Sequence, residues 1–216
     1  MRRYESGRTG NSRPATGSRL SLVAALLASL SVLPDAAAEP QVDTKGASEC
    51  KARGFSTDTD PKGTNVRSAP RADAPLIGHL SPQALIGPNT YEGVEFEIVG
   101  SKDGWLLIQK PDPATGLKFD PAYAAAGRGW ISGKLAGATL GSERLRGAPR
   151  LDAPIVARMS GENWGPDSVA VMAIHACQGR FVEVTGVPIG GKAVRGWSYA
   201  PCSNQLATCD HSGAAD

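Results

Sequence analysis

The residues most capable of chemistry in this 216-residue chain are cysteines and the histidines beside them. Zinc sites usually bring their ligands in C-x₂₋₄-C pairs, and no such pair occurs here. A cysteine peptidase would need Cys177 as its nucleophile, with a histidine as its base. Neither alternative has the spacing that its chemistry requires, so we expect these thiols to form disulfides, with no metal site. The cysteines and histidines considered for these two alternatives are His175, Cys177, Cys202, Cys209 and His211.

A glycine-rich run at 186–193 comes close to a phosphate-binding loop. That loop ends in Ser or Thr, which binds magnesium, but Ala193 stands at this position. It also joins a strand to a helix, whereas Val184 and Trp197 are predicted on two strands of a hairpin. The chain also has no G-x-S-x-G and no H-E-x-x-H motif. We therefore expect a hairpin loop, no cofactor and no enzymatic activity.

Residues 1–38 are typical of a secretory signal peptide, because five arginines precede an apolar run at 20–33 and alanines follow at 36–38. The run is shorter than the ~20 residues of a membrane-spanning helix. An uncleaved N-terminal anchor is the alternative. Cleavage would remove five of 23 basic and two of 21 acidic side chains, leaving 18 and 19 and a net charge of −1. We expect a periplasmic or secreted protein with no membrane span after cleavage and no nucleic-acid partner.

All four cysteines follow the predicted cleavage site, and an even number in an exported chain predicts two disulfides. Three pairings are possible. A Cys202–Cys209 bond would close a short loop and leave Cys50–Cys177 as a longer link, but spacing does not decide between the three.

An internal repeat organises the rest of the chain. Residues 64–80 and 143–159 share seven identities in 17 positions, at an offset of 79. The repeat continues to Gly-Trp pairs at 129–130 and 196–197. Trp105 and Trp130 are 25 residues apart and Phe181 and Trp197 are 16 apart, so the first copy carries nine more residues, within 111–127. Such surplus residues usually form surface loops.

Each copy reads as short strands. Apolar and polar residues alternate over 94–99, a turn follows at 102–104, and an apolar run resumes at Trp105. The second copy has the same pattern from 169 to 184, and a last strand is predicted at 127–131 and at 195–199. No helical apolar stripe follows the signal peptide. The prediction is all-β: a linker at 39–49, domains at 50–136 and 137–209, and a disordered tail at 210–216. Domains of this size are marginally stable, which gives the disulfides a structural purpose.

Four motifs of the first copy resemble the bacterial SH3-like (SH3b) domain family: NVRSAP at 65–70, PLIG at 75–78, Gly104-Trp105 and GWI at 129–131. The second copy departs from this pattern, since Arg144 replaces the Asn and Phe181 replaces the first Trp. The resemblance implies two tandem small open β-barrels of about five strands each. In each barrel a short helical turn follows the final Gly-Trp strand. Such domains are usually exported binding modules, and many recognise peptidoglycan peptides beside a cell-wall hydrolase.

Candidate ligand-binding residues are aromatics in polar loops and arginines that recur in both copies. Tyr91 and Trp164 lie in corresponding Pro/Gly-rich loops, where an aromatic either covers its own barrel or contacts a ligand. Trp105 stands with Trp130, Trp197 and Phe181 at equivalent strand positions, either in the core or in a binding groove.

The recurring arginines, Arg67 and Arg146, have two interpretations. Either they pair with Asp73 and Asp152 to hold a turn, or they bind a ligand carboxylate. The sequence therefore favours a non-catalytic binding module for a cell-wall peptide or an envelope protein. A structural or host-directed secreted protein without a small ligand is the alternative. A cell-wall hydrolase accessory with weak activity is a remote third.

Overall fold

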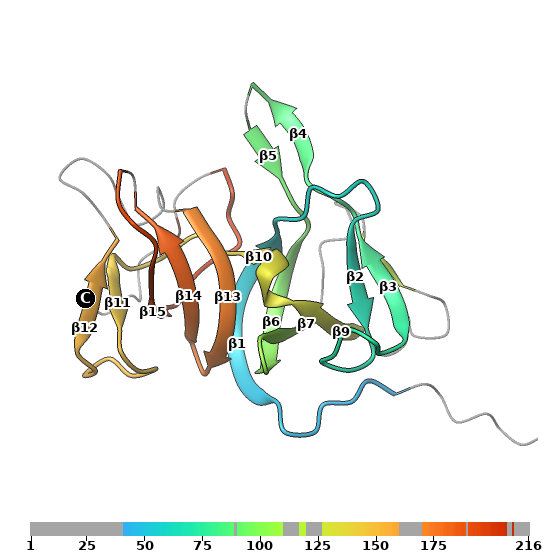
Figure 1. The fold of residues 1–216 in the computed structure, drawn as a ribbon, viewed down its shortest axis with the longest axis horizontal. Helices are drawn as coiled ribbons and strands as arrows, with labels where there is room; N and C mark the ends of the chain where they lie inside the picture. Colours follow the sequence, from blue (N-terminus) through green and yellow to red (C-terminus); the bar gives the residue numbers. More distant parts are fainter. Residues whose placement is uncertain are drawn as a thin grey trace, which may run out of the picture. The chain divides into compact units, whose positions relative to one another are not determined.

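The computed structural model describes residues 41–88, 90–109, 117–119, 127–159, 170–188, 190–206 and 209 (Figure 1). The predicted signal peptide, Trp164, His211, the tail at 210–216 and most of 111–127 lie outside these residues. The described part confirms the all-β prediction, since it contains strands, one short 3₁₀ turn at Gly133–Leu135 and no α-helix. The strands are β1 Ser48–Ser56, β2 Thr64–Arg67, β3 Leu76–Leu80, β4 Ala84–Gly87, β5 Thr90–Glu92, β6 Glu95–Lys102, β7 Trp105–Gln109, β8 Leu117–Phe119, β9 Arg128–Ser132, β10 Ala136–Gly137, β11 Arg144–Arg146, β12 Ile155–Arg158, β13 Ala170–Gln178, β14 Phe181–Val187 and β15 Val194–Tyr199.

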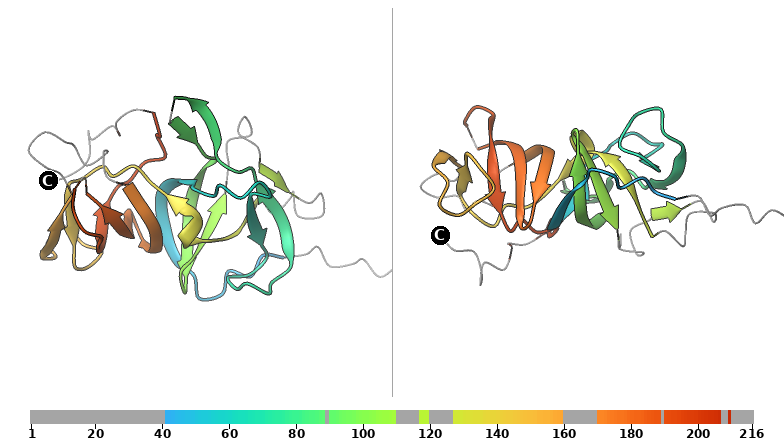
Figure 2. Two further views of the ribbon diagram at one scale, coloured as in Figure 1. Left: turned by 45° about the horizontal axis from the view of Figure 1, so that its top comes forward. Right: turned by 90° about the horizontal axis from the view of Figure 1, so that it is seen from below.

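These strands form an eight-stranded sheet, a five-stranded sheet and a separate two-stranded hairpin. The order in the large sheet is β10-β1-β6-β7-β9-β2-β3-β8, and in the second sheet it is β12-β11-β15-β14-β13. All pairings between these strands are antiparallel, and none of them closes either sheet into a barrel in the described part of the chain. The hairpin β4-β5 stands away from both sheets (Figures 1 and 2).

The sequence repeat is a structural repeat. The order β6-β7-β9-β2-β3 within the large sheet is the order β13-β14-β15-β11-β12 of the second sheet. Register agrees as well: Arg67 lies opposite Trp130, and Arg146 lies opposite Trp197. The same irregularity follows Val66 in the first copy and Leu145 in the second.

The two long hairpins also correspond residue by residue. Ile98 pairs with Ile108, and Ile174 pairs with Val184, and a bulge follows at the same place in both copies. In the first copy the turn consists of Asp103 and Gly104, both with positive φ, as the Asp-Gly pair predicts for a two-residue hairpin. A strand residue in one copy therefore has a defined counterpart in the other.

The recurring Gly-Trp pair has a packing reason. A Cβ at Gly129 would overlap the Val66 side chain, and a Cβ at Gly196 would lie 2.9 Å from Leu145 Cβ. These two contacts are equivalent in the repeat. Only glycine lets β9 and β15 approach their neighbouring strands this closely.

One cluster of buried apolar side chains runs through both copies, from Val66 and Ile98 in the first to Leu145 and Val184 in the second. Strand β1 lies between the two hairpins, because it pairs with β6 and also exchanges backbone hydrogen bonds with Gly179. In the C-terminal segment, Cys202 exchanges two backbone hydrogen bonds of 3.0 Å with Thr139, and Gln205 hydrogen-bonds to Gly93 in the first copy. Strand β1 and the segment at 202–205 thus tie the copies together.

Candidate functional site

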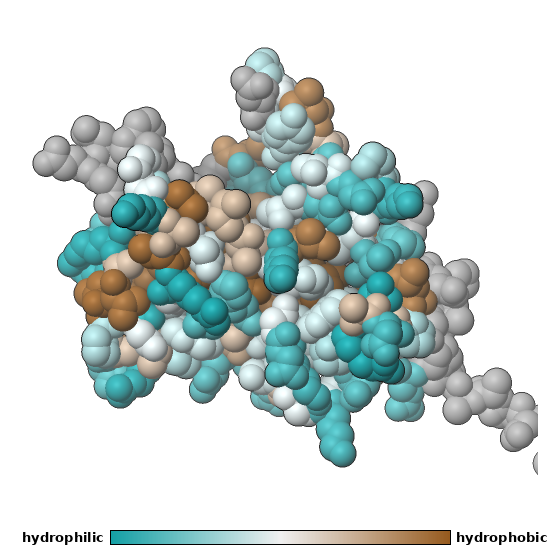
Figure 3. Space-filling view, viewed as in Figure 1, coloured by the Kyte–Doolittle hydropathy of each residue, from teal (hydrophilic) through white to brown (hydrophobic). Residues whose placement is uncertain are grey.

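Among the described residues of the first copy, the large apolar side chains with the greatest exposure lie on the hairpin β4-β5. Leu85 is 63% exposed, Tyr91 53% and Ile86 48%. Leu85 pairs directly with Tyr91, so these two side chains share one face of the hairpin, and the register shifts at Ile86, between Leu85 and Gly87. Figure 3 shows apolar atoms on this projecting element. The predicted contact residue Tyr91 therefore stands exposed, next to two aliphatic residues.

The base of this hairpin is firmly held. Gly93 N–H donates to Gln205 Oε1 at 2.8 Å, and Gln205 Nε2 donates to the Gly93 carbonyl at 2.9 Å. Two residues before Gln205, Ser203 Oγ donates to Glu95 Oε2 at 2.6 Å. On the other strand, Gln83 N–H donates to the Asp58 carbonyl at 2.8 Å. These bonds direct the hairpin away from the sheets while leaving its apolar side chains in solvent.

Arg67 and Arg146 hold turns, but not through the predicted partners. Each donates from Nη1 to a backbone carbonyl seven residues later: Arg67 to Ala74 at 2.7 Å, and Arg146 to Ala153 at 3.1 Å. The two arginines thus hold the turn in each copy, but each does so through a backbone carbonyl, and the predicted ion pairs with Asp73 and Asp152 do not form.

The aspartates bind other arginines. Arg71 contacts Asp73 at 2.7 Å, and Arg150 contacts Asp152 at 3.1 Å, each two residues away in an exposed turn. The hydrogen bond from Arg71 lowers the pKa of Asp73. Each copy thus holds one Arg–Asp ion pair at the same place in its turn.

Trp105 is half-buried, and it lies at the far end of β6–β7 from the hairpin. Eight residues of β6 separate the two, about 23 Å at the rise of an extended strand. Trp130 and Phe181 are buried, and Trp197 is half-buried. The structure therefore does not gather Tyr91, Trp105 and the two arginines into one site. Trp164 lies outside the described residues.

The cysteines form the bonds Cys50–Cys177 and Cys202–Cys209, so the prediction of two disulfides is confirmed. The two bonds indicate an oxidising, extracellular or periplasmic environment. Cys177 offers neither a thiol nucleophile nor a zinc ligand. In the described residues, no helix is long and apolar enough to cross a membrane.

Strand pairing shows the structure around the glycine-rich run and the histidines. The glycine-rich run joins β14 to the antiparallel β15, and Gly190 has a φ of 70° in the connection. It is a hairpin loop, as predicted. His79 lies in β3 and His175 in β13.

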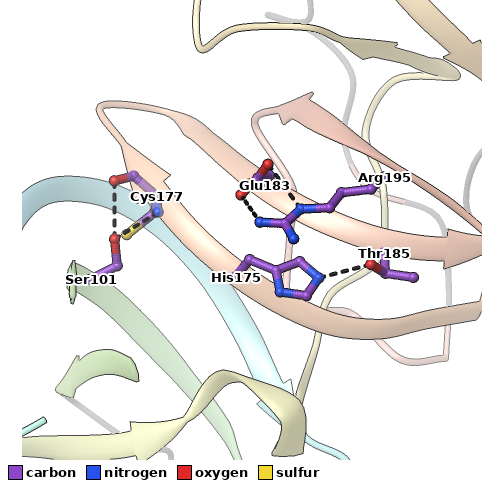
Figure 4. A network of polar contacts seen from close by, with 6 residues as sticks. All are labelled: Ser101, His175, Cys177, Glu183, Thr185 and Arg195. Atoms are coloured by element: carbon purple, nitrogen blue, oxygen red, sulfur yellow. Dashed lines mark hydrogen bonds and ion pairs between the residues drawn. The ribbon is translucent and has the colours of Figure 1, made fainter. Parts of the chain in front are cut away.

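His175 belongs to a polar network on the outer face of the second sheet (Figure 4). Its Nε2 lies 2.7 Å from Thr185 Oγ1. Beside it, Arg195 holds Glu183 with two bonds, Nε to Oε1 at 3.0 Å and Nη2 to Oε2 at 2.7 Å. Burial lowers the pKa of His175, and Arg195 lowers it further, while Glu183 opposes them. The structure thus favours the neutral imidazole.

This shift predicts a pH dependence of stability. The unfolded chain binds a proton on His175 near its ordinary pKa of 6.5, and the folded chain does so only at lower pH. His175 therefore costs folding stability as the pH falls below 6.5. An NMR titration should give a midpoint below 6.5, and the variant His175→Gln should lose less stability than the parent between pH 7 and pH 5. A midpoint above 6.5 would contradict this assignment.

Sequence reasoning missed Leu85, Ile86 and Gln205. The first two had a signal, since they are an apolar pair between Pro82 and Gly87-Pro88, where a plain turn would be polar. Gln205 had none, because its role depends on Gly93, more than a hundred residues earlier. Comparison of the chain with protein-family models, curated proteins and solved structures gives no match.

Proposed function

We propose that the protein is an exported, non-catalytic binding module, built from two tandem SH3-like units, which holds a protein partner of the cell envelope on the hairpin β4-β5. The observation that carries this proposal is the exposure of Leu85, Ile86 and Tyr91 on one projecting element.

The SH3-like assignment has support in addition to the motifs. Each copy contains five antiparallel strands in the same order, the number that the family resemblance implies. In the first copy, a 3₁₀ turn at Gly133–Leu135 directly follows the Gly-Trp strand, where the family has a short helical turn. Export has support from the signal-peptide pattern and from the two disulfides.

A protein partner suits the hairpin better than a cell-wall polymer. An isolated two-stranded hairpin is marginally stable in water, and this one exposes three large apolar side chains, Leu85, Ile86 and Tyr91. Burying them against another protein removes that surface from water, at about 25 cal/mol for each Å². A sugar-peptide polymer offers mostly polar groups, which these aliphatic side chains cannot satisfy.

The test offers two materials separately to the immobilised protein: envelope proteins solubilised in detergent, and purified peptidoglycan. We expect one envelope protein to be retained, and the double variant Leu85→Ser/Tyr91→Ser to retain at least about tenfold less. Ile155→Ser is the matched control, since Ile155 is an aliphatic residue of β12 with similar exposure, 43%.

The outcomes separate the hypotheses. Loss in the double variant with retention in the control supports the proposal. If only peptidoglycan were retained, and the double variant lost that retention, the hairpin would bind the cell wall and not a protein. Equal retention by all three proteins, or none, would overturn a binding role for the hairpin and favour a structural or host-directed protein.

A further inference from the structure

A pocket of about 340 Å³ lies on the outer face of the first sheet, away from the hairpin. The N-terminal segment 44–50 forms one wall, and strands β6, β7 and β9 form the floor. Val99 and Leu107 supply apolar surface to it. Its charged and polar side chains include Glu49, Gln109 and Arg128. This volume is at the lower end of small-ligand sites.

The wall of the pocket is held in place by the rest of the first copy. Asp43 N–H donates to the Ser68 carbonyl at 2.8 Å, and Trp130 Nε1 donates to the Asp43 carbonyl at 2.8 Å. Lys102 Nζ donates to the Lys45 carbonyl at 2.9 Å. The pocket is therefore formed before any ligand arrives, which lowers the entropic cost of binding.

Because the two copies share one register, each pocket residue on β6, β7 and β9 has an equivalent residue in the second copy. Gln109 pairs with Arg128 across β7 and β9, and Thr185 pairs with Arg195 across β14 and β15. The bulge of the first hairpin holds Val99, and that of the second holds His175. The register therefore matches four pocket residues with four residues of the network in Figure 4. The matched pairs are Val99 with His175, Leu107 with Glu183, Gln109 with Thr185, and Arg128 with Arg195.

The two equivalent arginines differ in one respect. In the second copy, the Glu183 carboxylate takes two hydrogen bonds from Arg195. In the first copy, Leu107 stands at the place of Glu183, and the Arg128 guanidinium has no hydrogen bond or ion pair with any described residue. The Arg128 guanidinium thus occupies the position of Arg195, but no carboxylate stands where Glu183 stands in the second copy.

We propose that this pocket binds a free amino acid or a short peptide, whose carboxylate takes on Arg128 the place that Glu183 takes on Arg195. A guanidinium binds a carboxylate through two parallel N–H···O bonds, the geometry already present in the second copy. Val99 and Leu107 receive the aliphatic part of the ligand, and the Glu49 carboxylate faces its ammonium group. This inference goes beyond the proposed function, because the pocket and the hairpin are separate surfaces.

The test is an NMR titration of the full, disulfide-bonded chain with L-alanyl-L-alanine and with the C-terminal amide of the same dipeptide. We expect saturable shifts centred on the backbone amides of Gln109 and Arg128. The amide derivative should bind at least about tenfold more weakly, since it lacks the carboxylate. Equal binding of the two probes, or no saturable shift at Gln109 and Arg128, would overturn the proposal.

Three variants locate the effect. Arg128→Gln should weaken dipeptide binding at least about tenfold, and Arg195→Gln, the equivalent change in the second copy, should leave it unchanged. Leu107→Glu should create in the first copy the ion pair that Glu183 and Arg195 form in the second, and so abolish binding. Because Leu107 is buried, that variant is informative only if it folds, whereas Arg128 is exposed and its substitution tests the proposal alone. Undiminished binding by Arg128→Gln, or equal loss in Arg195→Gln, would contradict the assignment.

Discussion

Replacing Cys50 and Cys177 together by alanine is expected to lower the free energy of unfolding by about 5 kcal/mol. The two residues are 127 positions apart, so their bond removes a large part of the conformational freedom of the unfolded chain. Lys51 N–H donates to the Gly179 carbonyl at 2.6 Å, and Gly179 N–H donates to the Glu49 carbonyl at 2.9 Å. Strand β1 would have to find these partners without a covalent link.

The second disulfide is the matched control. Cys202 and Cys209 are only seven positions apart, and the same relation predicts a loss of about 2 kcal/mol for their double alanine variant. Denaturation in guanidinium chloride, monitored by tryptophan fluorescence, measures both losses. If both double variants lost the same free energy of unfolding, constraint of the unfolded chain would not be the main contribution of these disulfides.

Trp130→Ala is expected to cost about 3–5 kcal/mol, the range for deletion of a large buried aromatic side chain. Trp130 has no exposed surface, and its Nε1 donates to the Asp43 carbonyl. The substitution therefore leaves a cavity in the first copy and also releases the N-terminal segment from the sheet.

Trp197→Ala is the control for this prediction, because Trp197 occupies the equivalent position and is half-buried. Its loss should be clearly smaller in the same denaturation experiment. Trp130→Phe removes the hydrogen bond and part of the ring, and the stability of that variant should lie between those of the parent and Trp130→Ala. Equal losses for Trp130→Ala and Trp197→Ala would mean that the N-terminal segment contributes no stability through this contact.

Local sequence patterns predict the strands well because they depend on near neighbours. Alternation at 94–99 predicts β6, Asp103-Gly104 predicts the turn, and the Gly-Trp pairs predict β9 and β15. Duplication strengthened each of these predictions, since two copies with matched apolar positions indicate one fold used twice.

Long-range partners could not be predicted in this way. The residues of β1 are mixed in polarity, and their partners β6 and β10 are about 45 and 80 positions away. The pairing of Arg67 with the Ala74 carbonyl was missed, because a carbonyl has no signature in the sequence whereas Asp73 does. The binding candidates Tyr91 and Trp105 looked alike as aromatics of one copy, yet only the course of β6 shows that they lie far apart.

The fastening of the C-terminal segment to the first copy has a practical consequence for anyone who divides this protein. A fragment that stops at residue 143 would keep Gly93 and Glu95 but lose the Gln205 and Ser203 side chains that bind them. It would also carry an unpaired thiol at Cys50, and the complementary fragment would carry one at Cys177. Separate halves should therefore cross-link wrongly or precipitate, and recombining them under oxidising conditions should restore solubility only when both are present.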